Sequence, residues 1–444
     1  MNRLSNPVSG SLRHTLFTWS AQDGLEPPLL VRGDGAHFID GSGRRILDFA
    51  SLVLNANAGI SHPKIVAAIQ AQAGILPAAG PGFATEIRAR YGAALATVTP
   101  PGLDRFLFTL GGAESNEHAI KIARIVTGRQ KILVRYRSYH GATMGAISLT
   151  GDPRRLPFEP GIPGIVRALD PYCYRCPFGW TPDVCKRPCI DHIEEILAYE
   201  GPDRFAAVLV ESAVGMNGAF WPPPEYMPRL REICDRHGIL LIADEILTGF
   251  GRTGRWFAFE HFGAVPDMIT MGKAISSGHA PLGAVAVNER VAAHFGKNVL
   301  LTGMTHTAHP ISLAAGEATI DAMRSGKMVE RAAERGPLVE ARLKRMMSAH
   351  PIVGDVRVLG LYGVLELVRD RATREPLVPW NGPAASQAPV KAIAKAALAA
   401  GVHLSTRWNY VFIAPPLCIS DEDLARGLDV VEQALSAAKP SRAA

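Results

Sequence analysis

Two stretches decide the fold of this chain: Ile239-Leu-Leu-Ile-Ala-Asp244-Glu245 and, a little further on, Pro266-Asp-Met-Ile-Thr-Met-Gly272-Lys273. Each is a short apolar run of strand length that ends in a charged side chain. Helical stretches such as Pro228–His237 separate strands of this kind along the middle of the chain. Strands that alternate with helices need crossover connections, so we expect parallel pairing and an α/β fold.

The same pattern extends in both directions. Further strands are predicted at Arg105–Thr109, Lys131–Arg135, Phe205–Glu211, Met268–Met271 and Gly283–Val287, with a helix over Ala113–Val126. Beyond them we predict a long helical stretch (311–350), strands at 356–366 and 402–413, and a closing helix (421–438). We therefore expect an N-terminal segment (1–60, with a hairpin at 37–51) that joins the small domain, a large domain (61–320) and a small α+β domain (321–444). The tail after Ala437 is expected to fray.

Composition excludes several classes of protein. The chain has 444 residues, of which 47% are hydrophobic and 20% charged, which rules out disordered, collagen-like and coiled-coil proteins. No apolar run approaches the roughly 18 residues of a membrane span. The first residues, 1–14, lack the apolar segment of a secretion signal, so we expect a cytoplasmic protein. The net charge of +6 is dispersed, which does not favour nucleic acid as a partner.

Three features together indicate one cofactor. Asp244 ends a buried strand, Lys273 follows another, and a glycine turn (Leu110–Glu117) joins a strand to a helix. Taken singly, each has an ordinary interpretation: a helix cap or surface acid, a solvated lysine, and a common βα turn. Together they supply a nucleophilic amine, an acid for a pyridinium proton and free amides for a phosphate, which are the requirements of pyridoxal phosphate.

The order and wording of the motifs resemble one family. Over about residues 28–436 the chain resembles the class III (ω-) aminotransferases that depend on pyridoxal phosphate, of the amine, taurine or β-alanine:pyruvate type. The motifs that carry the resemblance are LGGAESNEHAIK (110–121), YHG (139–141), VE (210–211), LIADEILTGFGRTG (241–254), PDMITMGK (266–273) and APLGA (280–284). The resemblance implies fold type I, with a mostly parallel seven-stranded sheet in the large domain and a smaller α+β domain.

The resemblance also implies roles for individual residues. Lys273 matches the residue that bonds to the cofactor and shuttles the proton, and Asp244 the partner of the pyridine nitrogen. The implied catalytic residues are Lys273, Asp244, Tyr139 and Glu211; the implied cofactor-binding residues are Gly112, Ala113, Tyr139, His140, Glu211, Asp244, Ile246, Lys273 and Thr305. Thr305 matches a position that reaches the phosphate of a neighbouring subunit, so the family implies a homodimer, which could pair further into a tetramer.

The chain departs from its family at several positions. Ala113 stands where relatives often carry a hydroxyl, and Leu247 and Met216 stand where ornithine-type relatives carry polar residues. Ser405 occupies the position of the carboxylate-binding arginine of amine:pyruvate enzymes, and Arg407 is the nearest replacement. Arg407 could grip a carboxylate bidentately or be a strand-edge arginine, and the sequence leaves both open.

The predicted substrate-binding residues are Trp19, Leu54 and Arg407. Trp19 and Leu54 suggest an apolar pocket wall, although packing explains Trp19 equally well. LVLNANAGISHP (52–63) is similar to the taurine and β-alanine enzymes rather than to the ornithine type. The expected reaction is a ping-pong transfer from a primary amine or ω-amino acid to a keto acid, with pyruvate as the expected acceptor. The alternative on the same scaffold is a decarboxylase, racemase or aminomutase.

Four cysteines lie within 17 residues of one another in an insertion (171–190) that the family lacks. Cys173, Cys176, Cys185 and Cys189 have the spacing C-x2-C-x8-C-x3-C, which matches a tetrahedral sulfur site in ligand count. Zinc and an iron–sulfur cluster are both candidates, and we expect either to act as a structural clip. The other interpretations are reduced or disulfide-paired thiols, and a redox protein centred on this loop.

Overall fold

The chain is built around a central seven-stranded sheet, and the computed structural model describes residues 7–438. The strand order is β4 (Arg105–Thr109), β10 (Gly283–Val287), β9 (Met268–Met271), β8 (Leu240–Asp244), β7 (Phe205–Glu211), β5 (Lys131–Arg135) and β6 (Ile165–Ala168). Only β10 runs antiparallel to its neighbours, which confirms the predicted mostly parallel sheet. Most of the predicted tail after Ala437 lies outside the described residues.

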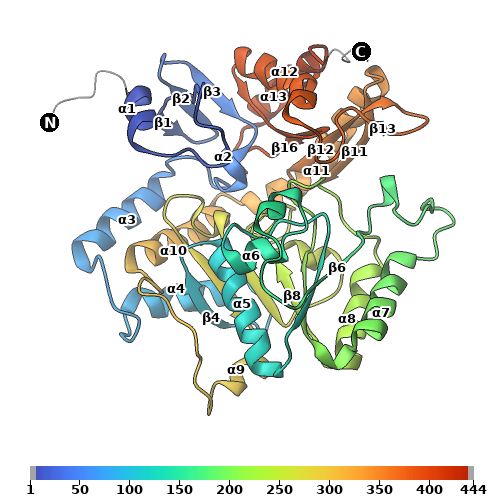
Figure 1. Ribbon diagram of the computed structural model, residues 1–444. Helices are drawn as coiled ribbons and strands as arrows, with labels where there is room; N and C mark the ends of the chain where they lie inside the picture. The colour runs from blue at the N-terminus through green and yellow to red at the C-terminus, as the bar shows by residue number, and fades with distance from the viewer. Residues whose placement is uncertain (1–6, 439–444) are drawn as a thin grey trace.

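Both faces of this sheet are covered. Val208 and Val210 of β7 pack with α7 (Pro188–Glu200) and α8 (Tyr226–His237), whereas Leu209, which points to the other face, packs with α5 (Gly112–Thr127). All seven residues of β7 are buried, as expected of a central parallel strand. Helices α3 (Pro63–Ile75), α4 (Glu86–Ala96) and α10 (Pro310–Ser325) pack together beside the sheet (Figure 1). The shorter helices are α1 (Pro7–His14), α2 (Ser51–Leu54), α6 (Met144–Leu149) and α9 (Glu289–His294).

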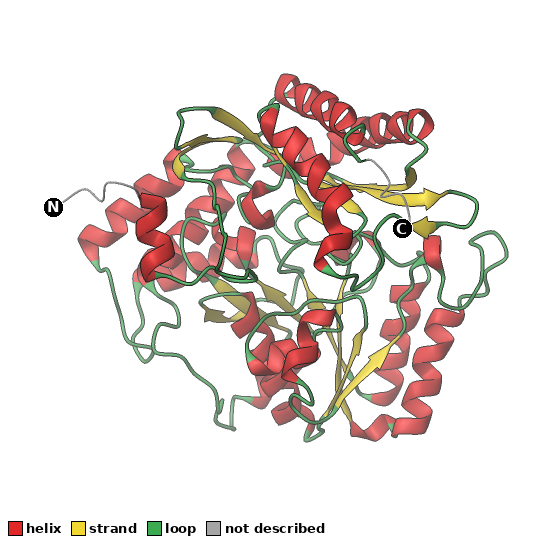
Figure 2. Cartoon of the chain, turned by 45° about the horizontal axis from the view of Figure 1, so that its top comes forward, coloured by secondary structure: helices red, strands yellow, loops and turns green. Residues whose placement is uncertain are grey.

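Two smaller sheets lie above the central one, and they are built from the N-terminal and C-terminal parts of the described chain (Figures 1 and 2). The first has the order β1 (Leu30–Asp34), β2 (His37–Asp40), β3 (Arg45–Asp48) and β14 (Val402–His403), and β2 and β3 form the predicted hairpin. The second has the order β11 (Val353–Leu359), β12 (Tyr362–Asp370), β16 (Tyr410–Ile413) and β15 (Ser405–Arg407), with β13 (Glu375–Pro376) beside β12. Segments 1–60 and 321–444 therefore share a sheet.

Three helices complete this part of the molecule: α11 (Met328–Ala349), α12 (Ala388–Ala399) and α13 (Asp421–Leu435). Helix α13 begins after Ser420, whose hydroxyl accepts a hydrogen bond from the Asp423 amide at 3.1 Å. Three acidic residues in its first turn suit the positive end of the helix dipole. No helix within residues 7–438 is long and apolar enough to cross a membrane.

Three predicted elements are divided in the structure. The helical stretch 311–350 breaks into α10 and α11 at Gly326-Lys327, where Lys327 has a left-handed φ of 47°. The strand predicted at 356–366 is a hairpin that turns at Gly360, whose φ is 60°. The segment 402–413 contains three short strands: β14 and β15 are separated at Leu404, and Trp408, with a φ of 46°, turns the chain between β15 and β16. The breaks at Lys327, Gly360 and Trp408 occur at a positive φ, which the hydrophobic pattern does not reveal.

Candidate active site

Lys273 lies beside the carboxyl ends of the parallel strands, where open α/β sheets bind their ligands. Glu211 on β7 is paired in register with Asp244 on β8, and Asp244 with Thr270 on β9, three residues before Lys273. Within residues 7–438 the Lys273 ammonium has no ion-pair partner, and its backbone has a left-handed φ of 47°. Burial lowers the pKa of Lys273, and the carboxylates of Asp244 and Glu211 oppose that effect only in part. The neutral, nucleophilic amine is therefore more accessible than in a solvated lysine.

Asp244 is almost fully buried, with 3% of its surface exposed, and three donors hold it in place. His140 Nδ1 lies 2.7 Å from Asp244 Oδ2, Asn116 Nδ2 donates to the same oxygen at 2.9 Å, and the Ile246 amide donates to Oδ1 at 3.1 Å. Asn116 also donates to the His140 carbonyl at 2.7 Å, which links the two side chains. The carboxylate thus has one fixed orientation. The hydrogen bond from Asn116 to Asp244 was not predicted from the sequence.

Glu211 holds the segment that carries Tyr139. Its Oε1 accepts a hydrogen bond from the Tyr139 amide at 2.8 Å, and its Oε2 accepts one from the Gly215 amide at 2.6 Å. Burial raises the pKa of Glu211, since only 6% of the residue is exposed. The contact with Tyr139 is made by the backbone amide, so Glu211 does not use the tyrosine ring.

The glycine turn before α5 is packed tightly against the residues that follow β8 and β9. A Cβ added at Gly112 would lie 2.7 Å from the Ile246 side chain, and one added at Gly272 would lie 3.0 Å from the Gly112 nitrogen. Only glycine allows this approach at both positions. The first amides of α5, including those of Gly112 and Ala113, have no partner within the helix and suit a phosphate.

These residues fit pyridoxal phosphate by the chemistry of their groups. An unpaired buried amine, a hydrogen-bonded carboxylate and a helix N-terminus converge on the carboxyl ends of the central strands. Lys273, Asp244 and the Gly112 turn are therefore brought together as the sequence analysis expected, with His140 and Ile246 in contact with Asp244 or the turn.

A second group of charges lies beside Tyr139. Asp152, which is fully buried, receives hydrogen bonds from Arg154 (Nη2–Oδ2, 2.7 Å) and from Arg407 (Nη2–Oδ2, 2.7 Å). The Arg154 guanidinium carbon lies 3.6 Å from the centroid of the Tyr139 ring, a cation–π contact. Two guanidinium groups thus share a single carboxylate. Arg154 was missed by the sequence analysis, whereas Arg407 turns out to point at Asp152 from the end of β15.

Burial leaves the Arg407 guanidinium short of partners. Its Nε is buried without a hydrogen bond within the described chain. Burial lowers the pKa of Arg407 to about 10, although the Asp152 carboxylate opposes this. A guanidinium in this position gains from an additional anion.

The other expected substrate and cofactor residues have different surroundings. Trp19 is 58% exposed; its ring centroid lies 6.3 Å from that of Tyr139, and the Arg154 guanidinium carbon lies 5.1 Å from its ring centroid. Leu54 is 2% exposed and belongs to the main hydrophobic core. Thr305 is exposed on the loop before α10. Trp19 is therefore close to the charged group, whereas Leu54 and Thr305 have no contact with it.

The structure gives no support to the predicted metal site at Cys173, Cys176, Cys185 and Cys189. Among residues 7–438, no group of three or more histidine, cysteine or acidic side chains is arranged to hold a metal ion, and all six cysteines are free. Cys189 belongs to the first turn of α7 and packs into an apolar cluster, where burial raises the pKa of its thiol to about 12. The sulfur of Cys185 accepts a hydrogen bond from the Arg187 amide at 3.3 Å. The described part of the chain therefore gives no support to a metal or redox centre in this loop.

Comparison with known proteins agrees with this geometry. Residues 20–435 match the family Aminotransferase class-III. A taurine–pyruvate aminotransferase of Bilophila wadsworthia is 34% identical over 367 residues, which cover 80% of each chain. The structure of a taurine:2-oxoglutarate aminotransferase from Bifidobacterium kashiwanohense, in complex with PLP and glutamate, superposes with a TM-score of 0.93 at 37% identity and covers 98% of both chains. An (S)-enantioselective ω-transaminase from Thermomicrobium roseum has a TM-score of 0.90 at 34% identity over 97% of both chains. The expected fold type I is confirmed by these likenesses.

Proposed function

Because the chain belongs to the class-III aminotransferase family and is an aminotransferase that uses pyridoxal phosphate, we propose that its amino donor carries an acidic group at a distance from the amine. The donor is an ω-amino acid or aminosulfonate such as β-alanine or taurine. The acceptor is a keto acid, with pyruvate as the expected one, and the transfer follows a ping-pong mechanism.

One observation carries this proposal: Asp152 is shared by Arg154 and Arg407 (2.7 Å each). Asp152 carries one negative charge and the two arginines carry two positive charges, so one positive charge is left unbalanced in a largely buried place. A carboxylate or sulfonate of the substrate would balance that charge through hydrogen bonds to the guanidinium groups. The charge lies over the ring of Tyr139, and Arg154 is close enough to lower the pKa of Lys273. The acid group would therefore be bound next to the Tyr139 ring, within the site that contains Lys273.

The known proteins support the same class of donor. Two of the similar proteins are aminotransferases of taurine, an amine whose acid group is a sulfonate. They differ in the acceptor that they are named for, which is pyruvate in one and 2-oxoglutarate in the other. The proposed donor class is thus supported by the unbalanced charge at Asp152 and by the similarity to the two taurine aminotransferases, whereas the acceptor must be measured.

Within the reaction, the residues of this chain have separable tasks. Bound pyridoxal phosphate supplies an aldehyde for the amine and a ring that accepts electrons. We assign to Lys273 the bond to the cofactor and the transfer of the proton at the substrate carbon. Asp244, oriented by His140 and Asn116, would pair with the ring nitrogen. The amides of the Gly112 turn would bind the phosphate.

We also propose that two copies of the chain form the working enzyme. Exposed Thr305 makes no contact with the Lys273 site of its own chain, so a role at the phosphate requires a partner. Large apolar side chains are exposed on the same loop and near the ends of α3 and α4: Ile75, Leu76, Phe83, Val299 and Leu301. Exposed large apolar side chains of this kind are typical of a subunit interface. Sedimentation analysis of the wild type and of Phe83→Glu with Leu301→Glu tests this: a dimer that the double variant disrupts is expected.

Donor pairs that differ only in the acid group test the proposed substrate class. As donors, β-alanine is compared with propylamine in steady-state assays of the purified enzyme. As acceptors, pyruvate is compared with 2-oxoglutarate in the same assays. We expect kcat/KM for β-alanine to exceed that for propylamine at least tenfold, with alanine as the product from pyruvate. Equal values for both amines would contradict the anion-binding role. Product formation without a keto acid would instead indicate a decarboxylase, racemase or aminomutase.

A further inference from the structure

Arg407 is carried at the end of a strained hairpin. It pairs with Tyr410 across β15 and β16, so Trp408 and Asn409 form the turn between these strands. Trp408 has a φ of 46°, a conformation that bulky residues avoid. Such a conformation persists only where surrounding contacts hold it. The direction of the Arg407 side chain therefore depends on whatever holds Trp408.

An indole stack holds Trp408. The ring centroids of Trp408 and Trp380 are 3.9 Å apart, and Trp380 lies in the loop between β13 and α12. The Arg407 guanidinium carbon lies 4.1 Å from the Trp408 centroid, and that of Arg137 lies 4.1 Å from the Trp380 centroid. The two indole rings are tilted by 40° to one another, and we call this pair, with an arginine over each ring, the indole stack. Each cation is attracted to its aromatic ring.

Arg137 is itself firmly fixed. Its Nη1 donates hydrogen bonds to the Asn217 carbonyl at 3.3 Å and to the Tyr410 hydroxyl at 3.1 Å. Its guanidinium carbon also lies 4.9 Å from the centroid of the Tyr172 ring. Arg137 stands two residues before Tyr139, so one short segment supplies both the support of the stack and the ring beside Arg154.

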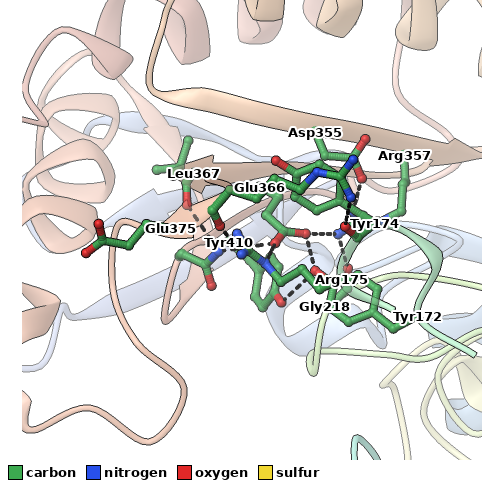
Figure 3. Close-up of polar contacts among 12 residues, drawn as sticks. Tyr172, Tyr174, Arg175, Gly218, Asp355, Arg357, Glu366, Leu367, Glu375 and Tyr410 are labelled. Atoms are coloured by element: carbon green, nitrogen blue, oxygen red, sulfur yellow. Dashed lines mark hydrogen bonds and ion pairs between the residues drawn. The ribbon is translucent and has the colours of Figure 1, made fainter. Parts of the chain in front are cut away.

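The stack ends in a buried polar network around Glu366 of β12, which Figure 3 shows. Glu366 is fully buried and pairs with Arg175 (Nε–Oε1, 2.6 Å) and Arg357 (Nη2–Oε2, 2.8 Å). Tyr172 donates its hydroxyl to the same carboxylate, and its hydroxyl lies 3.1 Å from that of Tyr410. Tyr172 and Arg175 of the cysteine-rich insertion thus bind, through Glu366, to the sheet that carries Arg407.

We propose that Trp380 is a positioning residue for the substrate's acid group: its stack on Trp408 holds the hairpin turn and directs Arg407 to Asp152. This inference rests on the proposed function, since Arg407 is the group that is positioned. Without the Trp380 ring, the strained turn loses the indole that packs against Trp408, and Arg407 samples other directions. Substrate acids then bind less tightly, while the groups around Lys273 are unchanged.

The test compares Trp380→Ala with Trp380→Phe and with Trp180→Ala in the holoenzyme. Trp180 is a matched control, because it is 37% exposed in the insertion and has no contact with the stack. We measure kcat and the KM for pyruvate, and by calorimetry the Kd of propionate, an unreactive carboxylate. For Trp380→Ala we expect the KM and the Kd to rise about tenfold while kcat stays within twofold. Trp380→Phe should restore most of the affinity, and Trp180→Ala should match the wild type.

A parallel Arg407→Met variant separates this inference from the function it rests on. If Arg407→Met weakens propionate binding and Trp380→Ala does not, the positioning role is wrong and the proposed anion site stands. If Arg407→Met changes neither the KM nor the Kd, the proposed role of Arg407 fails and the inference falls with it. A uniform fall in kcat with unchanged KM would also overturn the inference. Should Trp380→Ala fail to fold, Trp380→Leu takes its place with the same expectations.

Discussion

Replacement of Arg154 by methionine removes one of the two guanidinium groups that share Asp152. Arg154 donates to both Asp152 oxygens, with Nε–Oδ1 at 3.0 Å and Nη2–Oδ2 at 2.7 Å. In the variant, Asp152 and Arg407 neutralise each other, and no charge is left for a substrate acid. A hydrogen bond to a charged group contributes about 1.5–3 kcal/mol, so the KM for β-alanine and pyruvate should rise about 10- to 150-fold.

The assay measures KM and kcat for both acids, and kcat/KM for propylamine as a neutral donor. Methionine retains most of the length of the arginine stem, so packing against Tyr139 is kept. Arg155→Met is the matched control, because Arg155 is paired with Glu159 rather than with Asp152. We expect propylamine to react as in the wild type and the control to be unaffected. An equal loss for propylamine and β-alanine would refute the reasoning, since it would mean that Arg154 acts on the chemistry rather than on the acid group.

Three further predictions concern other parts of the molecule. Asn116→Ala removes a 2.9 Å hydrogen bond to Asp244 and should weaken cofactor binding about 5- to 50-fold, measured by titration of the apoenzyme; an unchanged affinity would contradict the role of Asn116. Burial raises the pKa of the Glu245 carboxyl from 4.5 to about 7, so the folded protein keeps this proton at pH values where the unfolded chain has lost it. The resulting contribution to the free energy of unfolding is complete below pH 4.5 and falls by up to about 3 kcal/mol as the pH rises to 7. The thermal midpoint of Glu245→Gln should therefore not show this decline with pH. Equal declines of the midpoint in the wild type and the variant would refute the role of Glu245. Cys176→Ser should keep full activity, with no zinc or iron found by elemental analysis in either protein; loss of a stoichiometric metal would contradict the structure.

The grouping of Lys273, Asp244 and the Gly112 turn could be predicted from the sequence for a physical reason. Parallel strands end at one edge of the sheet, so residues that follow separate strands must meet there. Asn116 could have been found as well, because it lies in the first turns of the helix that starts at the glycine turn. Its partner, however, depends on how that helix packs against β8.

Other features depended on contacts that spacing does not encode. Arg154 lies in a short helical turn (Pro153–Phe158) with no hydrophobic period, and only the folded chain brings it to Tyr139. The cysteine spacing matched a ligand count, but α7 begins at Pro188 and buries Cys189 in an apolar cluster. The break at Lys327 follows from a positive φ in a polar turn that also fits a helical pattern. Sequence patterns report periodicity, whereas these three outcomes depend on packing.

The central claim is that Lys273 and the paired arginines perform transamination of an acidic amine. Single-turnover spectroscopy tests it most directly: the absorbance of the bound pyridoxal phosphate is followed after addition of β-alanine or taurine, and then of pyruvate. We predict that one of these donors removes the band, that pyruvate restores it, and that Lys273→Ala does neither. A band that both donors leave unchanged, or a Lys273→Ala variant that completes the cycle, would contradict the account.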